Sequence, residues 1–131
     1  MDKNTIDEIR ELNKEIKDIV KNNSEDNKTI IPESDFVFDQ SKNNFNQDLI
    51  DKALIDGLHL EDKHLYPSDP NKKHKGKNYY CVYKYKEGFI LVNYLLISYA
   101  KRKEKIILFH ISPLSFGSIE QRKYKEIIKI L

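Results

Sequence analysis

The stretch YYCVYKYKEGFILVNYLLISYAKRKEKIILFHISP, residues 79–113, decides the fold of this chain. Its first part alternates, with the odd-numbered residues from Tyr79 to Tyr85 on one face and the even-numbered residues on the other. A period of two is typical of a β-strand. Two further apolar runs follow, at 89–100 and 106–111, each preceded by a short polar turn. The pattern predicts three antiparallel strands joined by tight turns.

The run at 89–100 is long for a strand and rich in leucine, so its periodicity alone leaves a helix open. Its β-branched and aromatic residues and the preceding Gly88 favour a strand, because such side chains suit a pleated, half-buried surface. We expect an α+β chain with an antiparallel meander sheet of three to four strands. We expect one helix before this sheet and one after it. A further amphipathic helix is expected at the N-terminus.

The N-terminal helix is expected within residues 1–22. The sequence TIDE at 5–8 has the form of a capping box with Thr5 as N-cap, and apolar residues then recur at helical spacing through Val20. Two interpretations stay open: the helix docks on its own domain, or it protrudes and binds a partner. A like helix would make a coiled-coil dimer, although the repeat covers only about three heptads. The residues of the partner-binding face would be Ile9, Leu12 and Ile16.

A polar segment at 23–34, which contains Pro32, is typical of a linker, so the compact domain is expected to span 35–131. Phe36-Val37-Phe38 predicts a short first strand, and Asp39 is placed to cap a following helix.

That helix should end at Gly57, where a glycine can take the C′ position. Residues 60–76 are expected to form a loop. The sequence SIEQ at 118–121 is a second capping box and predicts a C-terminal helix.

Composition bounds the class of protein. The chain has 131 residues, 34% charged and 39% hydrophobic, which fits one domain with a single core. Cys81 is the only cysteine, so an internal disulfide and a cysteine-based zinc site are excluded and a reducing, cytoplasmic setting is the simple interpretation. No signal peptide is visible, and the longest apolar run is shorter than the about 20 residues of a membrane span.

No metal or cofactor motif is present. The four histidines, at 59, 64, 74 and 110, form neither HExxH nor another compact ligand set. Neither GxGxxG nor a Walker A loop occurs, so we expect no nucleotide cofactor.

Basic residues gather beside aromatic ones in three clusters, at 72–77, 101–105 and 122–125. In a meander, the loop before the first strand and the turn after the second lie at the same end, so the first two clusters could converge. Converging cations with tyrosines suit a phosphate backbone and stacked bases, whereas the alternative is that these are solvated lysine-rich loops. The candidate nucleic-acid-binding residues are Lys72, Lys73, His74, Lys75, Lys101, Arg102 and Lys103.

His110 lies in the last apolar run, and by alternation it shares a face with Leu108 and Ser112. One interpretation is a satisfied, half-buried histidine. The other is a general acid or base, because imidazole titrates near neutral pH.

The chain resembles the BrnT toxins, ribonucleases of toxin–antitoxin modules with a RelE fold, over about residues 36–125. The first matching segment is FVFDQSKNNFN at 36–46, in which an aromatic-Asp pair is followed by lysine and asparagine at the family's spacing. The second is Ile111-Ser112, followed by Glu120 and Tyr124. The arginines that the family carries after its Ile-Ser pair are replaced here by Pro113, Leu114 and Ser115, and an N-terminal helix is added.

The resemblance implies a RelE/barnase-like domain that cleaves RNA without a metal and is paired with an antitoxin or another protein. Such chemistry needs an acid, a base and cations around the phosphate. His110 would be the acid or base, Lys75 and Lys77 would bind phosphate, Arg122 would stabilise charge, and Tyr124 would stack or donate a proton. The alternative is a non-enzymatic interaction or inhibitor protein of a phage or mobile element, which binds a protein partner or nucleic acid.

Overall fold

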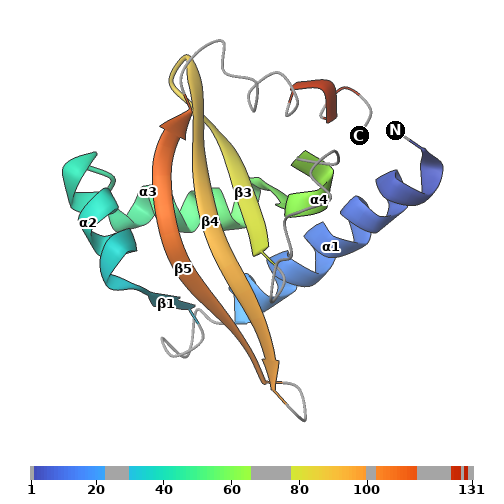
Figure 1. The fold of residues 1–131 in the computed structure, drawn as a ribbon, viewed down its shortest axis with the longest axis horizontal. Helices are drawn as coiled ribbons and strands as arrows, with labels where there is room; N and C mark the ends of the chain where they lie inside the picture. Colours follow the sequence, from blue (N-terminus) through green and yellow to red (C-terminus); the bar gives the residue numbers. More distant parts are fainter. Residues whose placement is uncertain are drawn as a thin grey trace.

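The computed structural model describes residues 2–22, 30–65, 78–99, 103–114, 125–127 and 129. They form an α+β fold (Figure 1). The elements are α1 (Lys3–Asn22), β1 (Ile30–Pro32), α2 (Ser34–Lys42), α3 (Gln47–Asp56), β2 (Leu58–Glu61), α4 (Asp62–Leu65), β3 (Asn78–Tyr85), β4 (Gly88–Tyr99) and β5 (Lys103–Leu114).

The sheet has five strands in the order β1-β5-β4-β3-β2. The predicted meander is confirmed as its centre, because β3 pairs antiparallel with β4 and β4 with β5. The expectation of a purely antiparallel sheet of three to four strands was wrong, since β2 joins antiparallel to β3 and β1 joins parallel to β5. Both missed strands lie at the edges and are too short, at three and four residues, to show a period of two.

Two predictions about the segment before β2 need correction. Phe36-Val37-Phe38 lies in α2, not in a strand, and the single helix expected up to Gly57 is two helices, α2 and α3. Asn46 is the N-cap of α3, and its side chain accepts a 2.9 Å hydrogen bond from the backbone N–H of Leu49. The polar side chain at 46 therefore starts a second helix inside a segment whose apolar spacing looked continuous.

The prediction that the helix ends at Gly57 is confirmed, since α3 ends at Asp56, and Gly57 follows it with an extended backbone, at φ −68° and ψ 165°. A Cβ at this position would lie 2.5 Å from Cys81 Sγ and closer still to the carbonyl oxygen of Ala53. Glycine is needed here because the backbone of residue 57 packs directly against β3.

The start of α1 also differs from expectation. The backbone N–H of Thr5 donates to Oδ1 of Asp2 at 2.8 Å, so Asp2 caps a helix that begins at Lys3. This hydrogen bond lowers the pKa of the Asp2 carboxyl.

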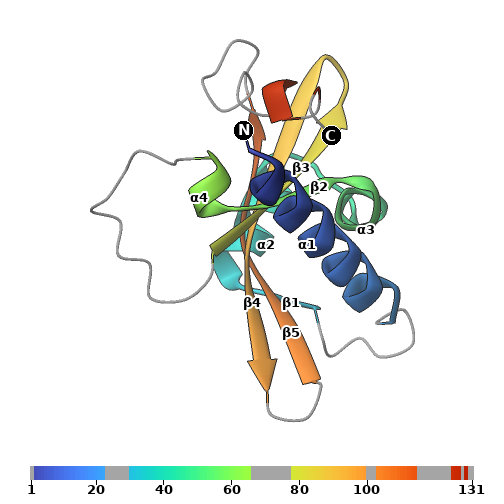
Figure 2. The ribbon, with the colours of Figure 1, turned by 90° about the vertical axis from the view of Figure 1, so that its right-hand side faces the viewer.

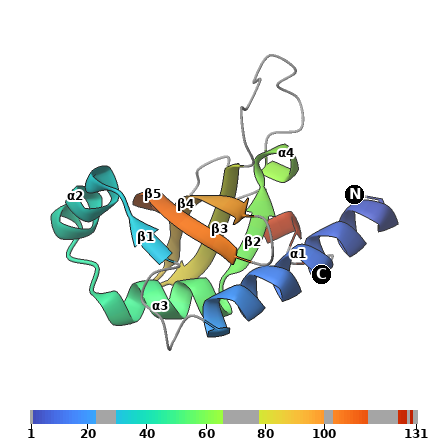
Figure 3. The same cartoon turned by 90° about the horizontal axis from the view of Figure 1, so that it is seen from below.

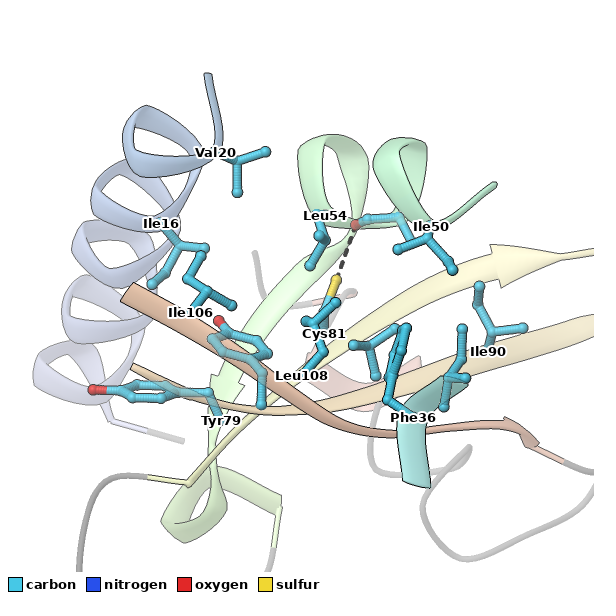
Figure 4. Packing of buried hydrophobic residues seen from close by; sticks show 14 of the residues in the cluster. Ile16, Val20, Phe36, Ile50, Leu54, Tyr79, Cys81, Ile90, Ile106 and Leu108 are labelled. Carbon is cyan, nitrogen blue, oxygen red and sulfur yellow. Dashed lines mark hydrogen bonds between the residues drawn. The ribbon is translucent and has the colours of Figure 1, made fainter. Parts of the chain in front are cut away.

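The main core lies on the sheet face that α1 and α3 cover (Figure 3). The predicted alternation of β3 puts Tyr79 and Cys81 on one face, and both are buried in this core. Tyr79 stacks on Tyr94 of β4 with ring centroids 5.5 Å apart. The Cys81 thiol donates to the Ala53 carbonyl oxygen at 2.9 Å (Figure 4). Burial raises the pKa of this thiol, so Cys81 is an inert core residue.

A smaller cluster lies on the other face. Val82 of β3, Phe89 of β4 and Leu60 of β2 are buried there together with Ile9 of α1 and Ile127. Residues 125–127 are helical, as expected for the C-terminal helix, whereas the capping box at 118–121 lies outside the described residues. Ile127 of this segment therefore contributes to the smaller cluster.

Candidate functional site

A β-bulge in β5 sets the direction of the side chains around His110. Asn93 of β4 pairs with His110, but the next residue, Tyr94, pairs with Leu108, so Phe109 is the additional residue. The bulge lets both Leu108 and Ile111 face the core, at 2% and 0% exposure. The prediction that His110 shares a face with Leu108 was therefore wrong, because strict alternation stops at the bulge. Such bulges often re-aim a side chain beside a functional site.

His110 meets a carboxylate from another element. Nδ1 of His110 lies 3.1 Å from Oδ2 of Asp39, which is on α2. Since a carboxylate only accepts hydrogen bonds, Nδ1–H is the donor, and Nε2 keeps the lone pair that can take up a proton. The His110 side chain is 58% exposed and that of Asp39 is 26% exposed, so a ligand can reach the ring from solvent.

Helix α2 is fixed beside β5. The backbone N–H of Glu33, just before the helix, donates to the carbonyl oxygen of Leu108 at 2.9 Å. Phe36 anchors the helix in the core at 1% exposure, while Phe38 is 67% exposed. The prediction that Asp39 caps a helix was wrong, because Asp39 lies inside α2. The only feature of the sequence that pointed to Asp39 as a site residue is its place in the first segment of the BrnT resemblance.

The second histidine, His59, has a different environment. Its ring is fully buried, with Nδ1 2.8 Å from the hydroxyl of Tyr94 and Nε2 2.9 Å from the carbonyl oxygen of Leu54. Because the carbonyl can only accept, Nε2–H donates and Nδ1 accepts from the tyrosine. Burial lowers the pKa of His59 to about 4 and keeps the ring neutral.

The backbone of His59 is held as well. Its N–H donates to Oδ1 of Asn13 at 2.8 Å, and Nδ2 of Asn13 donates to its carbonyl oxygen at 3.0 Å. His59 thus connects α1, α3, β2 and β4, and every polar group of its ring has a protein partner. We assign it a structural role.

A third histidine belongs to a charged cluster between α4 and α1. Nδ1 of His64 accepts from the backbone N–H of Glu61 at 3.1 Å, and Nε2 lies 3.8 Å from Oε1 of Glu8. Burial lowers the pKa of His64. Lys63 pairs closely with Glu8 and lies 3.7 Å from Glu61. The hydrogen bond to Glu8 raises the pKa of Lys63, and this cluster ties α4 to the first turns of α1.

The remaining predicted site residues, apart from Lys103 at the start of β5, fall into two groups. The expected partner-binding face of α1 is buried against the chain's own sheet and helices, with Ile9, Leu12 and Ile16 at 0%, 7% and 0% exposure. Of the two interpretations of the N-terminal helix, this burial corresponds to the helix that docks on its own domain. The other group lies outside the described residues and comprises Lys72, Lys73, His74, Lys75, Lys77, Lys101, Arg102, Arg122 and Tyr124.

The strand ends from which two basic segments leave are described, and they lie at one end of the sheet. Asn78 at the start of β3 pairs with Leu95, and Tyr99 at the end of β4 pairs with Lys103 at the start of β5. The β4–β5 hairpin extends beyond β3 at this end (Figure 2). The expected convergence of the two segments stays a prediction.

Within the described ranges, no group of three or more acidic, histidine or cysteine side chains is arranged to hold a metal ion. No helix among these residues has the length and apolar character to cross a membrane. Comparison with known proteins finds no match among family models, curated proteins or solved structures. The resemblance to BrnT toxins stays a prediction.

Proposed function

We propose that this chain is a metal-independent RNA-cleaving domain in which His110 transfers protons and Asp39 positions it. The observation that supports the proposal is the 3.1 Å contact between His110 Nδ1 and Asp39 Oδ2 on an exposed surface. A carboxylate on one ring nitrogen fixes the ring orientation and the tautomer, and it stabilises the imidazolium that forms when the other nitrogen takes a proton.

The reaction is an attack of the ribose 2′-hydroxyl on the adjacent phosphorus. A base removes the 2′-hydroxyl proton, the oxygen–phosphorus bond to the 5′ leaving oxygen breaks, and an acid protonates that oxygen. The products are a 2′,3′-cyclic phosphate and a free 5′-hydroxyl. Nε2 of His110 suits either proton transfer, while a second group, for which Tyr124 and Lys77 are the candidates from sequence, supplies the other.

Two features support RNA as the substrate. The basic clusters at 72–77 and 101–105 would neutralise phosphates and add charge stabilisation during the reaction. The two segments that carry the BrnT resemblance also come together, since Asp39 lies in the first and His110 directly precedes Ile111-Ser112 of the second. A cytoplasmic toxin controlled by an antitoxin is part of the same proposal, and the buried, unpaired Cys81 fits that setting.

A second candidate function is favoured by the outer surface of α2. Val37 and Phe38 are 47% and 67% exposed on this helix, next to Asp39. Exposed apolar side chains at the edge of a site suit a protein partner that covers the site. An interaction protein without catalytic activity would use this surface and leave His110 without a chemical role.

Cleavage of defined RNAs by the purified protein tests the proposal. His110→Ala should lower the rate constant by about 10²–10⁴-fold, the usual contribution of one acid–base group. Asp39→Asn keeps an acceptor for Nδ1–H but removes the charge. It should therefore lower kcat with little change in KM and shift the pH–rate profile, with Ser41→Ala on the same helix as control.

Thermal melting of the same preparations separates loss of chemistry from loss of fold. A folded His110→Ala protein that cleaves at the parental rate removes His110 from the mechanism. A parent protein that neither cleaves RNA nor arrests growth on induced expression in bacteria contradicts the proposal and favours the interaction protein.

A further inference from the structure

A hollow of about 400 Å³ lies where the β3–β4 turn, the end of β5 and the α2–α3 connection meet. The aromatic residues Phe45, Tyr85 and Phe89 line it, together with Pro113 and Lys86. Its size falls within the range of about 300–1,000 Å³ that is usual for small-ligand sites.

The aromatic lining is held by its surroundings. Phe45 is 6% exposed and belongs to the main core, against which Tyr85 also packs. The Phe45 and Tyr85 rings are perpendicular, at 89°, with centroids 5.9 Å apart. This edge-to-face contact orients the half-buried tyrosine ring before any ligand is present.

A cation stands at the rim. Nζ of Lys86 lies 5.1 Å from the centroid of the Tyr85 ring, and its side chain is exposed. Lys86 has φ 54°, a backbone conformation that residues other than glycine adopt rarely and that the following turn to Gly88 imposes. A positive charge thus lies beside an aromatic ring at the edge of the hollow.

The hollow and the His110–Asp39 pair lie along the same seam between α2 and β5. Asp39 meets His110, and further along Asn43 and Phe45, just after α2, line the hollow with Pro113 of β5. Nδ2 of Asn43 donates to the carbonyl oxygen of Asp39 at 2.8 Å and links the two places. Pro113 lies three positions beyond His110 along the strand, a span of about 10 Å at roughly 3.3 Å per residue.

We infer that the hollow binds a nucleobase of single-stranded RNA, next to the phosphate that lies at His110. Bases stack on aromatic side chains regardless of sequence, and a lysine at the rim can contact the phosphate of the same nucleotide. The inference rests on the proposed RNA-cleaving function and names the part of the substrate that this surface recognises.

Binding of a fluorescein-labelled 2′-O-methyl RNA hexamer, measured by anisotropy, tests this without cleavage because the attacking hydroxyl is blocked. A sugar–phosphate hexamer without bases is the second probe. Loss of one stacked base should weaken binding roughly five- to a hundred-fold. Tyr85→Leu should therefore lose affinity for the base-bearing hexamer by that factor and keep its affinity for the abasic one.

Matched controls lie on the same strand. Tyr83, half-buried on the same face as Tyr85 but away from the hollow, serves as Tyr83→Leu and should bind like the parent. Lys86→Gln should reduce the slope of log affinity against log salt by about one, and Lys84→Gln should reduce it less if phosphate contact is specific to the rim.

The outcomes separate this inference from the proposed function. Base-dependent binding that Tyr85→Leu abolishes supports the hollow as a base site, even where the parent fails to cleave RNA and the catalytic proposal falls. Cleavage by the parent with equal effects of Tyr83→Leu and Tyr85→Leu overturns the inference and leaves the function standing. Equal affinity of the parent for both hexamers also overturns it and points to an aromatic side chain of a protein partner in the hollow.

Discussion

His59 and His110 place the same side chain in two opposite settings. Both have Nδ1 engaged, at 2.8 Å by the Tyr94 hydroxyl and at 3.1 Å by Asp39. His59 also uses Nε2, on the Leu54 carbonyl, and is fully buried, whereas the side chain of His110 is 58% exposed. The difference teaches that the second ring nitrogen and its access to solvent, more than the first contact, separate a structural histidine from one available for chemistry.

The largest expected effect on stability comes from His59→Ala. The substitution leaves a cavity in the core and removes the partners of the Tyr94 hydroxyl and the Leu54 carbonyl. We expect a loss of about 3–5 kcal/mol in the free energy of unfolding. Urea denaturation followed by circular dichroism measures it, and a loss below about 1 kcal/mol would contradict a structural role.

The pH dependence of unfolding sharpens the same contrast. With its pKa lowered from 6.5 to about 4, folded His59 binds fewer protons than the unfolded chain between these pH values. Stability therefore falls as pH drops from 6.5 towards 4, by roughly 3 kcal/mol in total. His64, whose pKa burial also lowers, adds to the same trend.

Urea midpoints across this pH range provide the measurement. The dependence should be shallower in His59→Ala. An identical profile in parent and His59→Ala would show that the buried ring does not control it.

A smaller loss is expected at the glycine beside the His59 network. Gly57→Ala places a methyl group against Cys81 Sγ and the Ala53 carbonyl, and overpacking of this kind costs about 1–3 kcal/mol. Adding Cys81→Ala should recover part of that loss by removing one of the two contacts. Thermal melts of the single and double variants decide this, and equal melting temperatures for parent and Gly57→Ala would refute the close approach.

The smallest effect on stability is expected at the exposed pair. His110→Ala and Asp39→Ala should each change the free energy of unfolding by about 0–1 kcal/mol, since exposed ion pairs contribute little. The same urea assay measures it. A loss above about 2 kcal/mol in the free energy of unfolding for His110→Ala would give His110 a structural role like that of His59 and contradict the difference between them.

The strands that could be predicted from the sequence are those with a long run of extended, apolar-rich residues. β3, β4 and β5 were predicted because each carries eight or more residues of extended, apolar-rich sequence. β1 and β2 are too short for that and form only because β5 and β3 offer edges to pair with. Phe36-Val37-Phe38 has strand-like composition, but burial of Phe36 alone in the core suits a helix, so tertiary packing overrode local preference.

Of the two residues of the candidate site, the sequence singled out His110 but not its contact with Asp39. His110 could be chosen from its chemistry, but its partner Asp39 is 71 positions away in the sequence, and no local pattern connects them. The bulge at Phe109 is likewise decided by pairing with β4 and has no signature in the residues around it. The hollow at Tyr85 arises from three separate elements, which a linear pattern cannot bring together.

Asn13 and His64 have a consequence for how copies of this protein meet. The two backbone N–H groups of β2 that these side chains occupy, those of His59 and Glu61, are the groups an incoming strand would bind. Side chains thus stand where a sixth strand would add, and at the opposite edge β1 has three residues and ends in Pro32. Strand addition at β2 is thus obstructed by one amide and one imidazole, and Asn13→Ala would free only the His59 N–H while His64 keeps that of Glu61 occupied.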